Sequence, residues 1–396
     1  MMKHSDVLIV GGGPSGLCLA ARLAESGIHV RVLEKKEEIG SNIVCAGIIG
    51  KEIFDDFGLN KDSALGELQA VRLNSPFGTS IVYRHPKAFA YVVDRGRFDR
   101  NLAEEALEKG AVIELDTRAE DVRVSEDGVI ISVKTDDGKK GAYSARLAVV
   151  ASGIDYSLHK KIGLGTPKEY LNGAQMEVEA EIDIPATIFV GRDVAPGGFA
   201  WMVPSGRKRL RVGMLTRRDP KTYLSQMMKA SFPDRSAEAV IAGIKVKVIA
   251  QGLFSRTFGE RVLAVGEAAG QVKTTTGGGV AFGLLGADIA ARIILQSFAK
   301  NDFTAQALST YENAWKTVVQ KEIVLGGMAR RICARLSDLQ MERIFHLAQT
   351  DGVIPIIREK GDFDWHGDLI LALVKRLSFM NVFSGFSADP GPADFS

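Results

Sequence analysis

Residues 5–35 read SDVLIVGGGPSGLCLAARLAESGIHVRVLEK, and this stretch decides the fold. Residues 7–10 are a short apolar run of the kind that forms a strand buried on both faces. After GGGPSG, residues 17–26 carry apolar side chains at helical spacing, and residues 28–33 predict a second strand that ends at Glu34. A strand, a glycine-rich turn, a helix and a second strand in this order predict the first unit of a dinucleotide-binding α/β domain.

Each glycine of the turn has its own expected task. Gly11 allows the tight turn out of the strand, and Gly13 lets the backbone approach a pyrophosphate. Gly16 lets the helix pack closely on the sheet, and the N-terminus of that helix offers N–H groups to phosphate. Glu34 is placed to accept hydrogen bonds from a ribose. This stretch predicts an adenine dinucleotide and leaves NAD and FAD open.

The composition is that of a globular protein with a large core. The chain has 396 residues, of which 46% are hydrophobic and 25% charged, and its length predicts two to three domains. A net charge of +2 without a dense basic patch excludes a general nucleic-acid-binding protein. Cys18, Cys45 and Cys333 fit neither a disulfide framework nor a zinc cluster, and the histidines have no metal spacing. We therefore expect no metal and a cytoplasmic, reducing setting.

The apolar segments predict no membrane span. The longest of them, residues 277–295, is interrupted by Asp288 and Arg292, so a helix there is not expected to cross a bilayer. The apolar run at residues 7–10 is too short for a signal peptide. Any membrane association is expected to be peripheral.

The strand and helix patterns predict a discontinuous dinucleotide domain. We assign 1–67, 94–155 and 256–300 to that domain, the β-rich segments 68–93 and 156–255 to a second, substrate domain, and 301–396 to a helical C-terminal region. The return segment, RVLAVGEAAGQVKTTTGGGVAFGLLGADIAARII, predicts a buried strand that delivers Glu267 and a helix that starts at Gly279 and Val280. An acid and a second helix N-terminus are what FAD needs for its ribityl chain and flavin.

Six motifs in order resemble the geranylgeranyl reductase family of FAD flavoproteins, which includes the archaeal digeranylgeranylglycerophospholipid reductases. They are GGGPSG, Glu34, IGSNIVCAGIIG, DRGRFD, PGGFAWMVP and VGEAAGQVKTTTGGGVAFGLLGA. The resemblance covers nearly the whole chain and extends to KEIVLGGMARRICARLSD near its C-terminus. It implies an α/β FAD-binding, Rossmann-like domain of the p-hydroxybenzoate hydroxylase type, an antiparallel β-sheet substrate domain and a helical C-terminal region.

The resemblance also implies an activity and the residues behind it. The activity is reduction, by hydride from reduced FAD, of carbon–carbon double bonds in a geranylgeranyl or other polyprenyl group on a lipid, quinone or pigment precursor. The cofactor-binding residues would be Gly11, Gly13, Ser15, Gly16, Glu34, Cys45, Ala46, Ile48, Arg95, Ala119, Glu267, Gly279 and Val280. The isoprenoid cavity would be lined by Phe199, Trp201 and Pro204.

The chain departs from the family pattern at three positions. It has Glu267 where the family usually has Asp, Phe199 where it has Tyr, and Val203 where it has Phe. The missing tyrosine hydroxyl removes a hydrogen bond to a polar substrate head, so the motif leaves the particular substrate open.

Several residues have two interpretations from the sequence. Cys45 either takes part in proton delivery, as a catalytic residue, or is a small buried apolar residue. Arg330, Arg331 and Arg335 either attract a lipid phosphate or membrane surface, or form a solvated helical face. Residues 362–374 either cover the lipid cavity or touch a membrane, or pack against the core.

Two other functions stay open. The first is a flavin-dependent aromatic hydroxylase or halogenase of the same fold, because FAWMVP resembles the WxWxIP stretch of flavin halogenases without its first Trp. The second is a non-catalytic prenyl-binding protein. The expected partners of the reductase are a prenyl-lipid substrate and an electron donor, either reduced ferredoxin or NAD(P)H, since no second GxGxxG motif marks a nicotinamide site.

Overall fold

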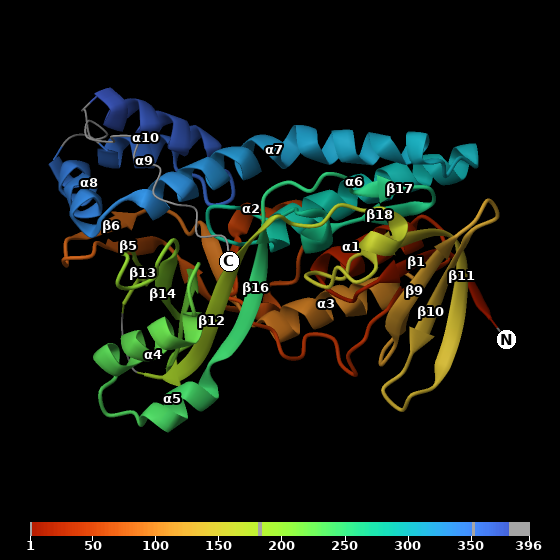
Figure 1. Ribbon diagram of the computed structural model, residues 1–396, viewed down its shortest axis with the longest axis horizontal. Coiled ribbons are helices and arrows are strands. Elements are labelled where there is room, and N and C mark those ends of the chain that lie inside the picture. The colour runs from red at the N-terminus through yellow and green to blue at the C-terminus, as the bar shows by residue number, and fades with distance from the viewer. Residues whose placement is uncertain (1, 181–183, 351–352, 380–396) are drawn as a thin grey trace.

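The computed structural model describes residues 2–180, 184–350 and 353–379, so the end of the expected C-terminal region lies outside the described residues. Two large sheets stand side by side, and a row of C-terminal helices runs along one edge of both (Figure 1). The first large sheet has eight strands, the second has seven, and a small three-stranded sheet completes the set.

The eight-stranded sheet is built around β1 (Lys3–Val10). Its two neighbours, β2 (Val30–Leu33) and β11 (Lys140–Val150), both run parallel to it. Val7, Leu8 and Ile9 are fully buried, as expected for an apolar run covered on both faces. The other strands of this sheet are β8 (Val112–Glu114), β9 (Arg118–Val124), β10 (Val129–Lys134), β17 (Phe258–Gly259) and β18 (Val262–Ala264).

Helices cover this sheet and bury its largest core. α1 (Pro14–Glu25) packs against α3 (Arg95–Glu108) and α6 (Val280–Lys300), and α7 (Ala305–Arg335) packs over α6 (Figure 1). By length and composition, α6 is the one helix of the described residues that could cross a membrane. Much of it is buried inside the protein, with Leu284 and Ile294 fully enclosed, so it serves here as a core helix.

The seven-stranded sheet has one face on helices and the other on a cavity. Neighbouring strands within this sheet are antiparallel, except β13 and β5, which are parallel to each other. Its strands in spatial order are β16 (Lys245–Gln251), β12 (Glu169–Glu179), β15 (Arg209–Thr216), β14 (Phe199–Pro204), β13 (Ala186–Phe189), β5 (Ala70–Asn74) and β6 (Ser80–Arg84). Ala200, Met202 and Val212 pack with Leu224 and Met228 of α4 (Pro220–Ser231), next to α5 (Ala237–Gly243).

The small sheet and the last helices join the other parts. The small sheet has the order β3 (Ile48–Gly50), β7 (Ala90–Val93) and β4 (Ala64–Leu68), next to α2 (Lys51–Asp56). Beyond α7 the chain forms α8 (Asp338–Thr350), α9 (Val353–Lys360) and α10 (Gly367–Phe379). The loop between α9 and α10, residues 361–366, turns back toward the sheets, where Phe363 packs with the cluster around Leu68 and Val92.

Candidate active site

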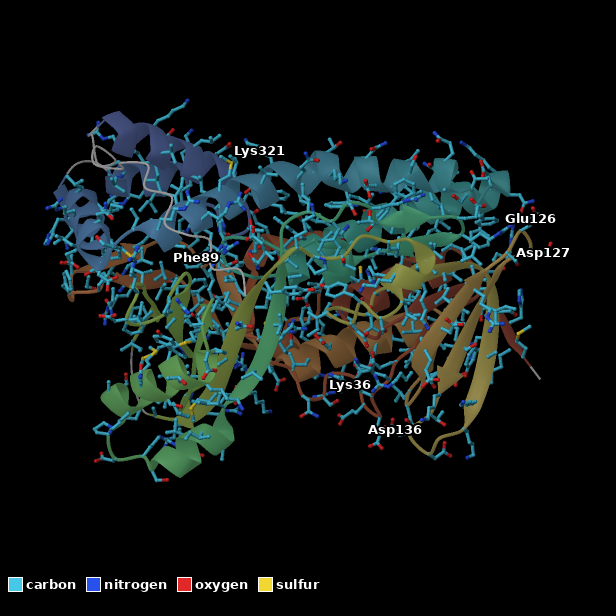
Figure 2. All side chains as sticks on the ribbon, viewed as in Figure 1. Lys36, Phe89, Glu126, Asp127, Asp136 and Lys321 are labelled. Carbon is cyan, nitrogen blue, oxygen red and sulfur yellow. The ribbon has the colours of Figure 1, made fainter. Side chains whose placement is uncertain are left out.

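A cavity of about 650 Å³ lies where the two large sheets meet. Its wall includes the glycine turn after β1, residues 38–49, the face of the seven-stranded sheet that carries Trp201, and the start of α6. Two of its lining residues are labelled in Figure 2, with Phe89 near the C-terminal helices and Lys36 below α3. The cavity therefore extends between these distant parts of the molecule and is long enough for an elongated ligand.

The glycine turn brings backbone to the cavity without side chains. A Cβ atom at Gly13 would meet no atom within 4 Å, so this position opens on free space. A Cβ atom at Gly16 would overlap the carbonyl oxygen of Gly11, and one at Gly11 would overlap that of Ala151. Gly11 and Gly16 are thus required by close packing of β1, α1 and β11, whereas Gly13 leaves room for a ligand.

Two helices point uncapped N-termini at the cavity. α1 begins after Gly13 and α6 after Gly279, and neither receives a side-chain cap or an acidic residue in its first turn. By contrast, side chains cap α3, α4, α5 and α7. Free N–H groups and the positive end of a helix dipole favour an anion. The cavity therefore has two anion-attracting positions that the protein itself leaves open.

Glu34 is fixed at the end of β2 by two backbone hydrogen bonds. Its Oε2 atom accepts from the Gly12 N–H group at 2.6 Å, and its Oε1 atom accepts from Lys36 N–H at 3.0 Å. The side chain is buried but lines the cavity. A carboxylate held in this way accepts further hydrogen bonds from hydroxyl groups, as a ribose would offer.

Ser15 and Glu267 mark the junction of the N-terminal and return segments. A Cβ atom at either Gly266 or Gly283 would overlap the Ser15 hydroxyl, so three distant segments meet at this point. Glu267 accepts a hydrogen bond through Oε2 from Lys247 Nζ of β16 at 3.0 Å. Its Oε1 atom is buried and has no partner among the described residues. An orphaned carboxylate oxygen in a cavity wall is an acceptor for a ligand hydroxyl.

Cys45 lies in a cationic pocket of the cavity wall. Arg95, at the start of α3, forms a two-pronged ion pair with Asp99 at 3.0 and 3.1 Å and also contacts the Cys45 thiol. Burial raises the pKa of this thiol, but Arg95, the Gly47 N–H group at 3.3 Å and Lys247 outweigh burial and hold the pKa below its ordinary value. Cys45 is therefore a more acidic thiol than a free cysteine.

The rest of the wall is apolar and aromatic. Phe199 and Trp201 of β14 lie 5.8 Å apart by ring centroids and both face the cavity. Phe89, which also lines the cavity, stacks on Phe363 of the loop between α9 and α10, also at 5.8 Å. Successive residues of a strand face opposite sides, so Val203 follows Phe199 and Trp201 on the cavity face and Pro204 does not.

The cavity brings together residues that are distant in the sequence. It is lined by fourteen of the predicted residues, namely Gly11, Gly13, Ser15, Glu34, Cys45, Ala46, Ile48, Arg95, Ala119, Phe199, Trp201, Glu267, Gly279 and Val280. Two others do not line it. Gly16 lies behind the turn, where it permits helix packing, and Pro204 is on the other side of its strand, so the lining residue at that end of β14 is Val203.

Arg211 is an important residue that the motifs did not single out. From β15 its guanidinium donates to the carbonyl oxygens of Ala46 at 3.1 Å and Val93 at 2.8 Å, while Nε donates to Glu177 at 2.6 Å. It thereby fastens the loop that carries Cys45 to the substrate sheet. The sequence does contain a sign of this role, because Arg211 is a charged residue within the strand pattern RLRVGML and lies on the same strand face as Gly213.

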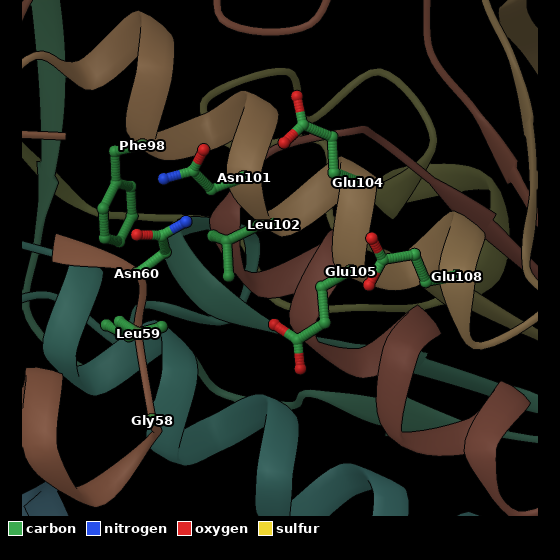
Figure 3. Close-up of a pocket in the computed structure, with 9 residues that line it drawn as sticks. All are labelled: Gly58, Leu59, Asn60, Phe98, Asn101, Leu102, Glu104, Glu105 and Glu108. Atoms are coloured by element: carbon green, nitrogen blue, oxygen red, sulfur yellow. The ribbon is translucent and has the colours of Figure 1, made fainter. Parts of the chain in front are cut away.

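A second, smaller cavity of about 230 Å³ shares no lining residue with the first. It lies beside α3, and Figure 3 shows Glu104, Glu105 and Glu108 on its wall with Asn60 and Asn101. None of its nine lining residues is a cation. Because carboxylates repel a pyrophosphate, this cavity does not compete for the dinucleotide.

Known proteins match this chain over most of its length. A family model described as FAD binding domain matches residues 4–324. A digeranylgeranylglycerophospholipid reductase from Methanoculleus marisnigri is 31% identical over 335 residues, which are 80% of this chain and 83% of the relative. Digeranylgeranylglycerophospholipid reductase 1 from Methanococcoides burtonii is 28% identical over 359 residues, 87% of each chain. A geranylgeranyl bacteriochlorophyll reductase-like structure from Thermoplasma acidophilum has a TM-score of 0.81, 21% identity and coverage of 96% and 100%, so it shows the shared fold.

The residues in the cavity fit FAD. Gly13 and the α1 N-terminus would hold the pyrophosphate, Glu34 the adenosine ribose, and the orphaned Oε1 of Glu267 a ribityl hydroxyl. When bound and reduced, FAD supplies a hydride, so the protein is an FAD-dependent oxidoreductase. The chain belongs to the FAD-binding domain family and, within it, to the digeranylgeranylglycerophospholipid reductase family.

Proposed function

We propose that this protein saturates carbon–carbon double bonds in a geranylgeranyl or related polyprenyl chain of a membrane lipid. The observation that carries the proposal is the apolar, aromatic part of the cavity wall, which includes Phe199, Trp201 and Val203 together with Phe89 and Phe363. A prenyl chain offers only hydrocarbon surface, and an aromatic, mostly apolar cavity buries such a surface well. The names of the relatives support a digeranylgeranylglycerophospholipid as the lipid.

We assign the proton of this reduction to Cys45. Saturating a double bond adds a hydride to one carbon and a proton to the other. The Cys45 thiol lines the cavity, and the thiolate left after proton transfer would be stabilised by Arg95 and the Gly47 N–H group. Solvent then returns the proton to the thiolate. The aromatic wall holds the alkene and excludes water from the reacting atoms.

Replacing Cys45 tests this assignment. The substitution Cys45→Ala removes the acid, so kcat for alkene reduction should fall by about 10²- to 10⁴-fold, with the reductant supplied as dithionite. The matched control is Cys333→Ala, because Cys333 is exposed on α7. Its kcat should equal that of the unmodified protein. An unchanged kcat in the Cys45 variant, with FAD bound, would mean that the proton comes from another group.

The electron donor is proposed to be an external reductant, either a reduced ferredoxin or NAD(P)H. The motif GxGxxG occurs once, at the N-terminal turn, and it serves the FAD adenosine half. Anaerobic stopped-flow mixing with each donor separates the two, because the flavin absorbance near 450 nm is lost only with a donor that reduces it, on the order of seconds or faster.

We also propose peripheral contact with the membrane that holds the lipid. Supporting features are exposed apolar side chains on α7 (Val324 and Met328) and on α10 (Leu371 and Val374), two helices that pack together. Arg331 and Arg335 are exposed near the end of α7, whereas Arg330 is largely buried against Glu169 at 3.1 Å. Co-sedimentation with vesicles of anionic and of neutral lipids tests the contact and its dependence on charge.

Lipid mass spectrometry tests the reductase activity itself. The protein is expressed in a host that makes geranylgeranylated lipids, with a reductant supplied. Products should be heavier than their precursors by whole pairs of hydrogen atoms, and the variant Gly13→Ala, which blocks the cofactor position, should give none. Absence of such products from FAD-loaded protein contradicts the proposal. Oxygen consumption with an aromatic substrate and NAD(P)H would instead indicate a hydroxylase. Purified protein that does not bind added FAD would indicate a prenyl-binding protein.

A further inference from the structure

Gln175, Gly213 and Trp201 form one row across three neighbouring strands. Gln175 of β12 pairs with Gly213 of β15, and Gly213 pairs with Trp201 of β14. Residues directly opposite each other in antiparallel strands share a face of the sheet. Both side chains therefore stand on the cavity face, one on each side of a residue that has no side chain, and both line the cavity.

The missing side chain at Gly213 brings the two polar groups together. A Cβ atom at Gly213 would lie 2.5 Å from Cζ2 and 2.6 Å from Cε2 of Trp201, so the indole ring lies over this glycine. Cε2 is bonded to Nε1, so the indole N–H group also lies above the strand that separates Trp201 from Gln175. Any other residue at position 213 would displace the indole.

Both polar groups are buried without a hydrogen-bond partner. Gln175 Oε1, an acceptor, and Trp201 Nε1, a donor, have no partner among the described residues, and Gln175 is only 8% exposed. The apolar neighbours on the same face, Ile188, Phe199 and Leu215, offer no side-chain hydrogen bond. The cations on that face, Arg211 and Lys247, donate to Glu177 and Glu267 instead. Buried polar groups are normally paired, because an unpaired one forfeits its hydrogen bonds to water. A donor and an acceptor left open side by side in a cavity wall indicate a ligand.

We propose that Gln175 and Trp201 form a polar recognition subsite within the apolar wall, which binds a ligand group that presents a donor beside an acceptor. Two ligands of this cavity offer that chemistry. One is the imide edge of the isoalloxazine ring of FAD, with N–H next to C=O. The other is a hydroxyl-bearing polar end of the prenyl substrate, and this alternative rests on the proposed function. A saturated or unsaturated hydrocarbon chain alone offers neither group.

Three variants test the subsite. Gln175→Met and Trp201→Phe remove one polar group each and keep an apolar side chain, of similar shape in the first variant and smaller in the second. Gln251→Met is the matched control, because Gln251 is also buried with an unpartnered Oε1 atom but does not line the cavity. Replacing an unpaired buried polar group by an apolar one of similar volume is nearly neutral or stabilising, so the melting temperature of the FAD-free protein should not fall for Gln175→Met. A small fall is expected for Trp201→Phe, which loses ring volume, and for Gln251→Met, which loses the hydrogen bond from Gln251 Nε2 to the Ala250 carbonyl at 3.1 Å.

The affinities then separate the two ligands. In the first arm, FAD is titrated into FAD-free protein without lipid. If the imide edge is the ligand, the Kd for FAD rises about tenfold for Gln175→Met and Trp201→Phe and stays unchanged for Gln251→Met. In the second arm, FAD-loaded protein is titrated with geranylgeraniol and with the corresponding hydrocarbon. If the lipid is the ligand, the two cavity variants lose their preference for the alcohol by about tenfold.

Neither arm requires catalytic turnover, so the experiment can contradict the proposed subsite without contradicting the proposed reductase activity, and the reverse. Unchanged affinity in both arms overturns the subsite. A lowered melting temperature of Gln175→Met with unchanged affinities also overturns it, because Gln175 would then serve the packing of the sheet. A weakened FAD complex in protein that reduces no lipid would leave the subsite intact and remove only the proposed activity.

Discussion

At the residue scale, Gly13 and Gly16 should respond in opposite ways to one substitution. A Cβ atom at Gly16 overlaps the backbone of Gly11, so Gly16→Ala should lower the free energy of unfolding by about 1–3 kcal/mol. A Cβ atom at Gly13 meets only the open cavity and the backbone there is extended, so Gly13→Ala should keep the stability. It should nevertheless weaken FAD binding, because the methyl group takes the place of the pyrophosphate.

Thermal unfolding and FAD titration of both variants check this pair. A Gly13 variant that binds FAD as tightly as the unmodified chain would contradict the assignment of this turn to the pyrophosphate. Equal loss of stability in the two variants would contradict the difference in packing.

Sequence patterns predict the roles of the glycines better than they predict which side chains face the cavity. The glycine turn and Glu34 have a local signal, because strand, turn and helix follow one another within 30 residues. Val203 and Pro204 are adjacent, and only the strand register decides which of them faces the cavity. Gln175 belongs to no sequence motif. Its role depends on the missing side chain of Gly213 on the neighbouring strand and on the absence of a hydrogen-bond partner for its Oε1 atom among the described residues.

At the element scale, the loop at residues 361–366 makes the stability of the protein depend on pH. His366 is partly buried, with its Nδ1 atom 2.7 Å from the Thr275 hydroxyl, and desolvation, together with Lys273, lowers its pKa to about 4 from 6.5. Between these values the unfolded chain binds a proton that the folded chain does not. The free energy of unfolding should therefore fall as the pH falls from 6.5 to 4, by on the order of 3 kcal/mol from this group, and be fully present above pH 6.5.

Denaturant unfolding between pH 5 and 7 measures this contribution. His366→Gln keeps a donor and an acceptor but cannot titrate, so its stability should vary less with pH than that of the unmodified chain. His29→Gln changes an exposed histidine and should retain the original dependence. Identical slopes for the His366 variant and the unmodified chain would contradict a neutral, partly buried His366.

Elements with strong local periodicity could be predicted, and short ones could not. The sequence patterns predict α1, α3 and α6, because their apolar faces repeat at helical spacing. β11 runs from the exposed Lys140 to the fully buried Val150, so its two halves share no single pattern. The strands β3 and β4 of the small sheet were not predicted, because they have three and five residues and pair with β7 across more than twenty residues of sequence.

At the scale of the whole molecule, one buried ion pair joins the C-terminal region to the cofactor segment. Lys273 donates to Asp364 at 2.5 Å, and their side chains are only 8% and 7% exposed. Lys273→Met or Asp364→Leu leaves an unpaired buried charge and should cost about 3–5 kcal/mol of unfolding free energy. The double variant should recover most of this loss, because it removes both charges.

A double-mutant cycle measured by denaturant unfolding checks the pair. Strictly additive losses would contradict the coupling. From the sequence, residues 362–374 either cover the cavity, touch a membrane or pack against the core. Phe363 both lines the cavity and packs against a buried cluster, and Asp364 lines the cavity. The sequence alone does not indicate the ion pair, because Lys273 and Asp364 are 91 residues apart and neither position has a local pattern.

The place of β1 in the middle of its sheet has a consequence for biosynthesis. β1 is synthesised well before its partner β11, which ends at Val150, and the Ser15 hydroxyl lies against Gly283 of α6, later still in the chain. The nascent chain therefore cannot close the cofactor pocket until translation has passed that residue. Because contacts so distant along the chain slow folding, we expect FAD to bind only after residues 266–283 have been synthesised.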